Sequence, residues 1–249
     1  MQTTIDDLPG RIQAALVGAL AGEAAAGTAA GGADLLGVAE SVAASGGFDE
    51  ADLRHRGLER PSRSGSAGLL LRALPFGLLT PLDRPRLRRD AYRCVALAGA
   101  DEGTAVTAVA AAILIADLLR YDLGTALVRV RQSLLEDAPM ALLHRLSVRD
   151  EDSSVSGDPD PGTALQGAIT ALDGVEAVRD AVQRAQGGSV VALTLAGALS
   201  GARWGLEAIS DVDVDSVSHA DRAVSIAHRL SERATALLPA VVEAGYPSG

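Results

Sequence analysis

The chain has 249 residues, of which 48% are hydrophobic but only 2% aromatic, and its formal net charge is −10. Its core must therefore be built from Ala, Leu, Val and Ile, and because Ala is the strongest helix former, this composition predicts an all-α fold. The acidic balance, without a basic stripe, excludes nucleic acid from the expected partners. The longest apolar run, 104–119, is too short to cross a bilayer, and the acidic start is unlike a secretory signal. We therefore expect a cytoplasmic protein with no membrane partner.

Helical periodicity dominates the chain. The first predicted helix covers 10–26, because Ile12, Leu16, Ala19 and Glu23 recur on one face. A Pro/Ser/Gly linker is expected over 60–65, followed by an apolar stretch that ends at Pro75. Further helices are predicted, in chain order, over 34–44, 50–56, 84–97, 102–118, 123–136, 139–146, 163–172, 175–185, 190–201 and 219–242.

Two local features bear on domain organisation and chemistry. The segment 149–162 (RDEDSSVSGDPDPG) is acidic, rich in Pro, Gly and Ser, and without apolar period, which predicts a mobile surface loop within a single domain covering 1–249. The single cysteine, Cys94, lies in an apolar run, and we interpret it as a buried structural thiol. The four histidines are scattered, and none stands at metal-ligand spacing from Cys or Glu.

Five sequence blocks carry a resemblance to a known family. They cover 11–24, 33–41, 46–53, 66–78 and 187–206. In this order the blocks resemble the ADP-ribosylglycohydrolase family, which includes the dinitrogenase-reductase-activating glycohydrolases, and the last block is the most specific. The resemblance spans about residues 11–210. It implies a compact all-α orthogonal bundle that hydrolyses a glycosidic bond to ADP-ribose at a two-magnesium centre.

The chain departs from the family at the polar positions that hold these metals. The family motifs are Gly-Asp-Ala-x-Gly, Thr-Asp-Asp-Thr, Gly-Asn-Gly-x-x-x-Arg, Thr-His and Asp-Thr-Asp-Thr. In the first motif, this sequence has Glu23 in place of Asp, and the second motif falls on Gly31, Gly32, Ala33 and Asp34. The third motif keeps Gly68 and Arg72 but lacks the Asn. The Thr-His pair falls on Ala98 and Gly99, and the last motif falls near Gly188, Ser189, Val190 and Val191. Because valine and glycine side chains cannot bind Mg²⁺, we expect no metal site, no cofactor and no hydrolysis by the family mechanism.

Five polar residues remain in the implied pocket. Glu23 and Asp34 are the candidate catalytic residues, and Arg72, Ser189 and Arg203 are the candidate substrate-binding residues. Structural roles compete with these. Asp34 and Ser189 could each cap a helix, and Glu23 and Arg72 could form a buried ion pair, because a buried carboxylate needs a partner.

Two functions from different classes follow. The leading hypothesis is a non-hydrolytic family member that acts as a partner-binding regulatory or structural subunit. The alternative is a metal-independent enzyme of specialised metabolism, in which a carboxylate base and an arginine promote elimination, or intramolecular amine displacement, of a sulfate or phosphate. Whether the chain is an enzyme stays open at this point. The expected partner is a protein subunit or a carrier protein, with a small-molecule substrate for the alternative. A third reading, ADP-ribose binding without hydrolysis, is disfavoured because the long loop between the family's first two motifs is reduced here to 27–30.

Overall fold

The structure is a computed structural model that describes residues 7–28, 31–136, 138–146, 160–212 and 217–243, with side chains to residue 238. Every regular element in these residues is helical, which confirms the all-α prediction. The helices are α1 (Leu8–Ala25), α2 (Gly31–Ser45), α3 (Glu50–His55), α4 (Leu69–Leu79), α5 (Arg84–Leu97), α6 (Glu102–Leu118), α7 (Leu123–Leu134), α8 (Met140–Arg145), α9 (Pro161–Ala171), α10 (Val178–Arg184), α11 (Val190–Trp204), the short 3-10 helix η1 (Gly205–Ile209) and α12 (Ala220–Glu243).

Aspartate side chains begin many of these helices. In each case the carboxylate accepts a hydrogen bond from a backbone amide in the first turn, which satisfies a donor that the helix itself leaves unpaired. The residues are Asp7 (α1), Asp49 (α3), Asp83 (α5), Asp101 (α6), Asp122 (α7) and Asp160 (α9). Part of the acidic excess of the chain is thus used to define helix starts.

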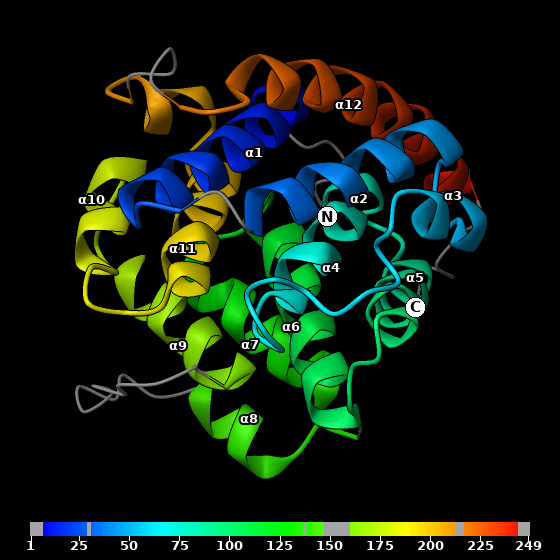
Figure 1. The fold of residues 1–249 in the computed structure, drawn as a ribbon, viewed down its shortest axis with the longest axis horizontal. Helices are drawn as coiled ribbons and strands as arrows, with labels where there is room; N and C mark the ends of the chain where they lie inside the picture. Colours follow the sequence, from blue (N-terminus) through cyan, green and yellow to red (C-terminus); the bar gives the residue numbers. More distant parts are fainter. Residues whose placement is uncertain (1–6, 29–30, 137, 147–159, 213–216, 244–249) are drawn as a thin grey trace.

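Helix α6 is the central element. All its residues from Thr104 to Leu118 are buried, and it contacts α4, α5, α7, α9 and α11, which surround it in Figure 1. Small side chains allow these neighbours to come close. A Cβ atom added to Gly77 of α4 would lie 2.2 Å from the backbone oxygen of Ala112.

Helices α1 and α11 form a close antiparallel pair (Figure 1). A Cβ on Gly18 would lie 2.4 Å from the backbone oxygen of Gly197, and one on Gly22 would lie 2.2 Å from that of Leu193. At the other end of the pair, a Cβ on Gly201 would lie 2.1 Å from the backbone oxygen of Ala14. The repeated four-residue spacing of glycines on both helices lets the two backbones touch.

The apolar stretch that was expected to end at Pro75 is part of helix α4, which does not stop at the proline. The helix continues to Leu79, and every one of its side chains is buried. A proline inside a helix removes one backbone hydrogen bond. Packing of α4 between α2, α5 and α6 holds the segment helical nevertheless, which local sequence signals cannot reveal.

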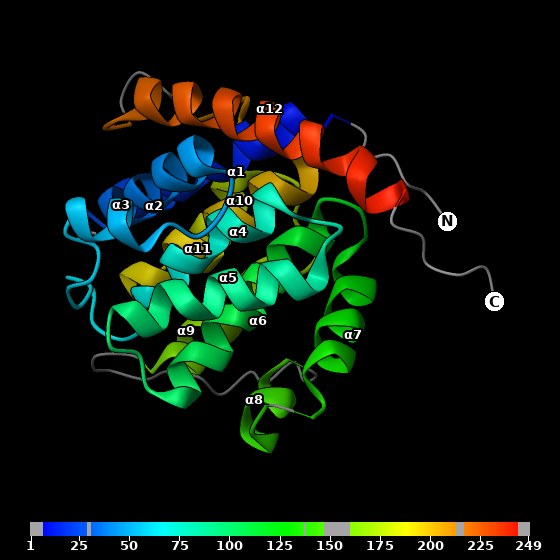
Figure 2. The same cartoon turned by 90° about the vertical axis from the view of Figure 1, so that its right-hand side faces the viewer.

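Helix α12 lies across α1 and α2 on one side of the molecule. Helices α7 and α8 lie at the edge of the molecule (Figure 2). None of the described helices is both long and apolar enough for a membrane crossing. Most of the predicted acidic loop, 149–162, falls outside the described residues, although its last two residues, Pro161 and Gly162, already belong to α9.

Candidate functional site

Glu23 lies near the end of α1, and its carboxylate faces the start of α2. Its side chain is buried, as the apolar face of α1 predicted. Oε1 of Glu23 accepts hydrogen bonds from the backbone amides of Gly31, at 2.5 Å, and Gly32, at 2.9 Å. The first amides of a helix have no internal partners and carry the positive end of the helix dipole, so they stabilise a buried carboxylate. The partner of Glu23 is therefore a helix N-terminus.

The space beside this contact is filled. A Cβ atom on Gly32 would lie 2.3 Å from Oε2 of Glu23 and 2.6 Å from Cδ2 of Leu20. A Cβ atom on Gly31 would lie 2.7 Å from Cδ1 of Leu71. Neither position could carry a side chain without displacing its surroundings, so Gly31 and Gly32 offer backbone amides and no side-chain ligands.

Arg72 of α4 is the most buried charged group near this point, with its side chain 2% exposed. Nε and Nη2 donate to Oδ2 of Asp34, at 3.1 and 2.7 Å. Nη1 donates to the backbone oxygens of Leu58, at 2.7 Å, and Arg60, at 2.8 Å. The predicted pairing of Arg72 with Glu23 is wrong, because the carboxylate of Glu23 accepts from the α2 amides and Arg72 donates to Asp34, one turn further on.

Asp34 is not the N-cap of α2, because it lies inside the helix. The helix begins three residues earlier, at Gly31, and Asp34 lies in its first turn. A carboxylate there is also favoured by the helix dipole. Three nitrogen atoms of Arg72 thus fix α4, the start of α2 and the segment after α3 to one another.

Cys94 packs behind this arginine, with Sγ 3.9 Å from the backbone oxygen of Arg72. Burial raises the pKa of the Cys94 thiol to about 12, although the nearby charge of Arg72 lowers it in part. The thiol therefore stays protonated and unreactive at neutral pH. The interpretation of Cys94 as a structural residue is confirmed.

Ser189 and Arg203 stand at opposite ends of α11. Ser189 is the N-cap of the helix, and its Oγ accepts from the amide of Ala192 at 3.1 Å. The antiparallel α1–α11 register places Gly22 against Leu193 and Thr194, in the first turns of α11 after Ser189. Arg203 lies roughly 20 Å away along the helix, where its Nη1 donates to the backbone oxygen of Leu172 at 3.4 Å and its guanidinium stacks on Trp204.

The structure thus brings Glu23, Asp34 and Arg72 together around the start of α2, whereas Ser189 caps α11 and Arg203 stands at the far end of that helix. Sequence reasoning missed the other half of the arrangement, the backbone groups of Gly31, Gly32, Leu58 and Arg60. Backbone donors and acceptors carry no sequence signature. The one available signal was the Gly31–Gly32 pair, whose lack of side chains lets a carboxylate approach the helix start.

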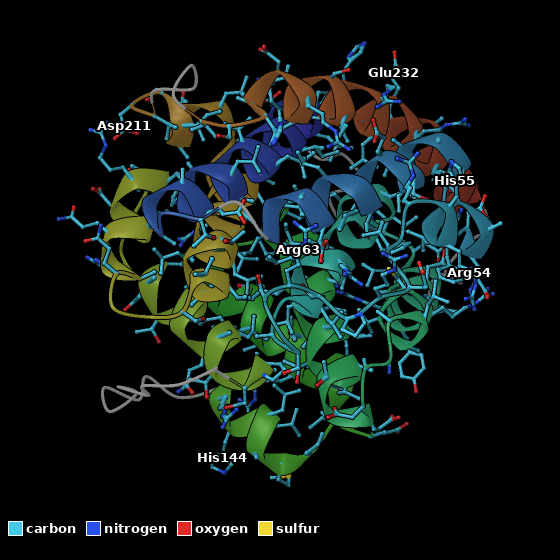
Figure 3. The ribbon with its side chains drawn as sticks, in the orientation of Figure 1. Arg54, His55, Arg63, His144, Asp211 and Glu232 are labelled. Carbon is cyan, nitrogen blue, oxygen red and sulfur yellow. The ribbon has the colours of Figure 1, made fainter. Side chains whose placement is uncertain are left out.

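The residues present do not fit the two-magnesium centre that the family resemblance implies. Hard divalent cations take oxygen ligands, but the carboxylates of Glu23 and Asp34 are bound to helix amides and to Arg72, and Val191 is buried among apolar side chains. Within the described residues, no three His, Cys, Asp or Glu side chains gather into a group that could hold a metal ion. Figure 3 shows two of the histidines, His55 and His144, at distant edges of the molecule.

Comparisons with known proteins agree with this fold. The ADP-ribosylglycohydrolase family model matches residues 31–237, which leaves α1 and Glu23 outside the match. A solved structure described as an ADP-ribosylglycohydrolase-related protein complex superimposes with a TM-score of 0.75, at 18% sequence identity, over 92% of this chain and 99% of that chain. A search of the curated proteins finds no match. Because the family model covers most of the chain, the protein belongs to the ADP-ribosylglycohydrolase family.

Proposed function

We propose that this protein is a non-hydrolytic member of its family that acts as a partner-binding regulatory or structural subunit. The observation that carries the proposal is the contact of Glu23 with the amides of Gly31 and Gly32. The second family motif would supply metal ligands at this helix opening. Here Gly31 and Gly32 supply only backbone donors, Asp34 is paired with Arg72, and the carboxylate of Glu23 occupies the adjacent space.

The similarity to a protein complex supports the partner-binding part of the proposal. The solved structure with the same fold is described as a complex, and the likeness extends over nearly all of both chains. At 18% identity the likeness concerns the fold alone. The proposal for this chain therefore rests on that fold together with a site whose charged side chains are hydrogen-bonded to groups of the same chain.

The alternative, a metal-independent enzyme, receives less support from the geometry. In that mechanism the guanidinium of Arg72 must accept a departing anion. Three of its nitrogens already donate to Asp34 and to two backbone oxygens, and its side chain is 2% exposed. An anion would have to displace these partners, and each displaced group would then be buried without a hydrogen bond, which costs free energy.

Hydrolysis and metal binding test the first half of the proposal. We expect no heat of micromolar Mg²⁺ binding in calorimetric titration, and no release of ADP-ribose from ADP-ribosylated arginine with Mg²⁺ present, because a two-metal reaction cannot proceed without its ligands. A metal-dependent member of the family serves as the positive control. Two stoichiometric Mg²⁺ sites, or turnover that chelation abolishes, would contradict the proposal.

Complex formation tests the second half. We expect the chain, co-expressed with the products of its neighbouring genes, to elute with one of them as a complex of defined stoichiometry in size-exclusion chromatography with light scattering. A chain that elutes alone from every such co-expression, and that converts a sulfated or phosphorylated amine substrate without a partner, would favour the enzyme instead.

A further inference from the structure

The segment 59–64, between α3 and α4, buries little of its surface. It forms turns rather than helix, and in Figure 1 it crosses in front of α4 as a cyan coil. Pro61 and Arg63 are exposed, and Ser62 is the one buried side chain of the six. A segment with so little buried apolar surface opens at a lower free energy than the helices around it. We call 59–64 the strap.

Within the described residues, one hydrogen bond ties the strap to a helix. Nη1 of Arg72, in α4, donates to the backbone oxygen of Arg60 at 2.8 Å. The remaining hydrogen bonds of the strap join its residues to one another or to the turn at 65–68. Leu58, just before the strap, is fixed separately, because its buried side chain packs against α2 at Gly37. The strap thus begins at a fixed residue and is latched by a single arginine.

Two features of the strap favour opening. Oε2 of Glu59 is buried and has no hydrogen-bond partner, and Oε1 lies 3.6 Å from Nε of Arg60. A buried carboxylate oxygen without a partner costs free energy that contact with water would recover. At the other end, Gly65 has a φ of 65°, and glycine adopts positive and negative φ about equally well. The backbone can therefore change direction at this residue.

The end of the strap lies beside the contact between Glu23 and α2. A Cβ atom on Gly31 would lie 3.5 Å from Oε1 of Glu23 and 3.7 Å from Oγ of Ser64, so both side chains reach the same point of α2. Figure 3 labels Arg63, the residue before this serine, between α2 and α4. Movement of the strap would therefore bring water to Glu23 and would remove one of the two backbone acceptors of Nη1 of Arg72.

We propose that the strap is a movable cover of this site, which opens between Leu58 and Gly65, is held closed by Arg72, and in its open state exposes the carboxylate of Glu23. The closed state keeps the charged groups within the chain, and the open state presents them to a binding partner. Opening is a property of this chain alone. It is therefore tested separately from the proposed function, which stands or falls by the metal-binding and co-expression experiments above.

Carbodiimide labelling of the full chain measures the opening, because a carboxylate reacts only when water and the reagent reach it. Mass spectrometry of the digested chain gives a labelling rate for each carboxylate. We expect Glu23 to react at a rate that low urea concentrations leave unchanged, because a local opening exposes little surface. The internal control is Asp117, whose side chain is 2% exposed and pairs with Arg84. It should react only through global unfolding, at a rate that rises with urea.

Two strap variants should change the rate for Glu23 in opposite directions. Glu59→Met removes the unpaired buried oxygen, so it should slow the labelling of Glu23 by about fivefold or more. Gly65→Ala strains the closed backbone, so it should speed the labelling by about the same factor. The matched control is Gly46→Ala, because Gly46 also has a positive φ, of 77°, but lies just after α2 and outside the strap. This control should leave the rate for Glu23 unchanged.

Three results would overturn the strap as a cover. The first is labelling of Glu23 that rises with urea as that of Asp117 does. The second is a rate for Glu23 that neither strap variant changes. The third is an equal change in this rate on Gly46→Ala, which would show that the effect does not depend on the strap.

Discussion

At the residue scale, the buried charges near the start of α2 divide into two separate contacts. Glu23 is bound by the amides of Gly31 and Gly32, and Arg72 by Asp34 and two backbone oxygens. The sequence placed Glu23 on the inner face of α1 correctly, because that inference needs only helical periodicity. It could not identify the partner, since a helix N-terminus and an arginine are equally good partners for a buried carboxylate.

A double-mutant cycle distinguishes the two pairings. Asp34→Asn should lower the free energy of unfolding by about 3–5 kcal/mol, because it leaves the buried guanidinium of Arg72 without its counter-charge. The Asp34→Asn and Arg72→Met changes should be coupled by about 0.5–3 kcal/mol. Glu23→Gln and Arg72→Met should instead be additive, because the two side chains form hydrogen bonds with different groups. Urea unfolding of the single and double variants measures these values.

Strong coupling between Glu23 and Arg72 would contradict the assigned contacts. Unchanged unfolding of Arg72→Met, together with loss of partner binding or of any activity found, would show that the arginine serves function more than stability.

At the element scale, the α1–α11 pair depends on glycines whose positions the sequence displayed but whose contacts it did not. Gly18 and Gly197 each lie against the backbone of the other helix, and an added Cβ would come within 2.0 to 2.4 Å of a backbone oxygen. A backbone oxygen cannot rotate away as the end of a flexible side chain can. The whole helix would have to shift, and the end of α1 that carries Glu23 would move with it.

Alanine substitutions test this contact. Gly18→Ala and Gly197→Ala should each destabilise the fold by about 1–3 kcal/mol or more, as overpacking does. The matched control is Gly167→Ala in α9, where the added Cβ would lie 3.5 Å from Cβ of Ala192, an ordinary contact. That change should be neutral or stabilise by up to about 1 kcal/mol, because Ala favours helix over Gly. Equal melting temperatures for all three variants would refute the close backbone contact.

At the scale of the whole molecule, one carboxylate holds helices from opposite ends of the chain together. Glu40 of α2 pairs with Arg56, just after α3, and with Arg222 and Arg229 of α12, at 2.8, 2.9 and 3.4 Å. Burial of Glu40 alone would raise its pKa, but the hydrogen bonds and charges of Arg222 and Arg56 outweigh burial and lower the pKa below its usual 4.5. The hydrogen bond from Arg56 likewise lowers the pKa of Asp52.

This arrangement predicts a pH dependence of stability. Because the pKa of Glu40 is lower in the folded than in the unfolded chain, its carboxylate stabilises the fold above pH 4.5, and this contribution disappears as the pH falls further through the lowered pKa. Glu40→Gln should therefore reduce stability at pH 7 and flatten the loss on acidification, measured by urea unfolding between pH 3 and 7. Glu50→Gln removes an exposed ion pair with Arg54, and it should change neither the stability at pH 7 nor its loss on acidification. Identical pH profiles for Glu40→Gln and the original chain would refute the role of Glu40.

The sequence by itself determined the helical class, the order and approximate bounds of the helices, the buried state of Cys94 and Glu23, and the family. These follow from local periodicity, capping residues and composition, which each segment carries independently of its neighbours. Only the tertiary structure decided that α4 continues through Pro75, that α2 begins at Gly31, that Arg72 pairs with Asp34, and that Arg203 stands far from the other candidates. Each of these depends on backbone groups of one segment meeting another segment far along the chain, and backbone groups are the same in every residue, so the sequence cannot specify which of them will meet.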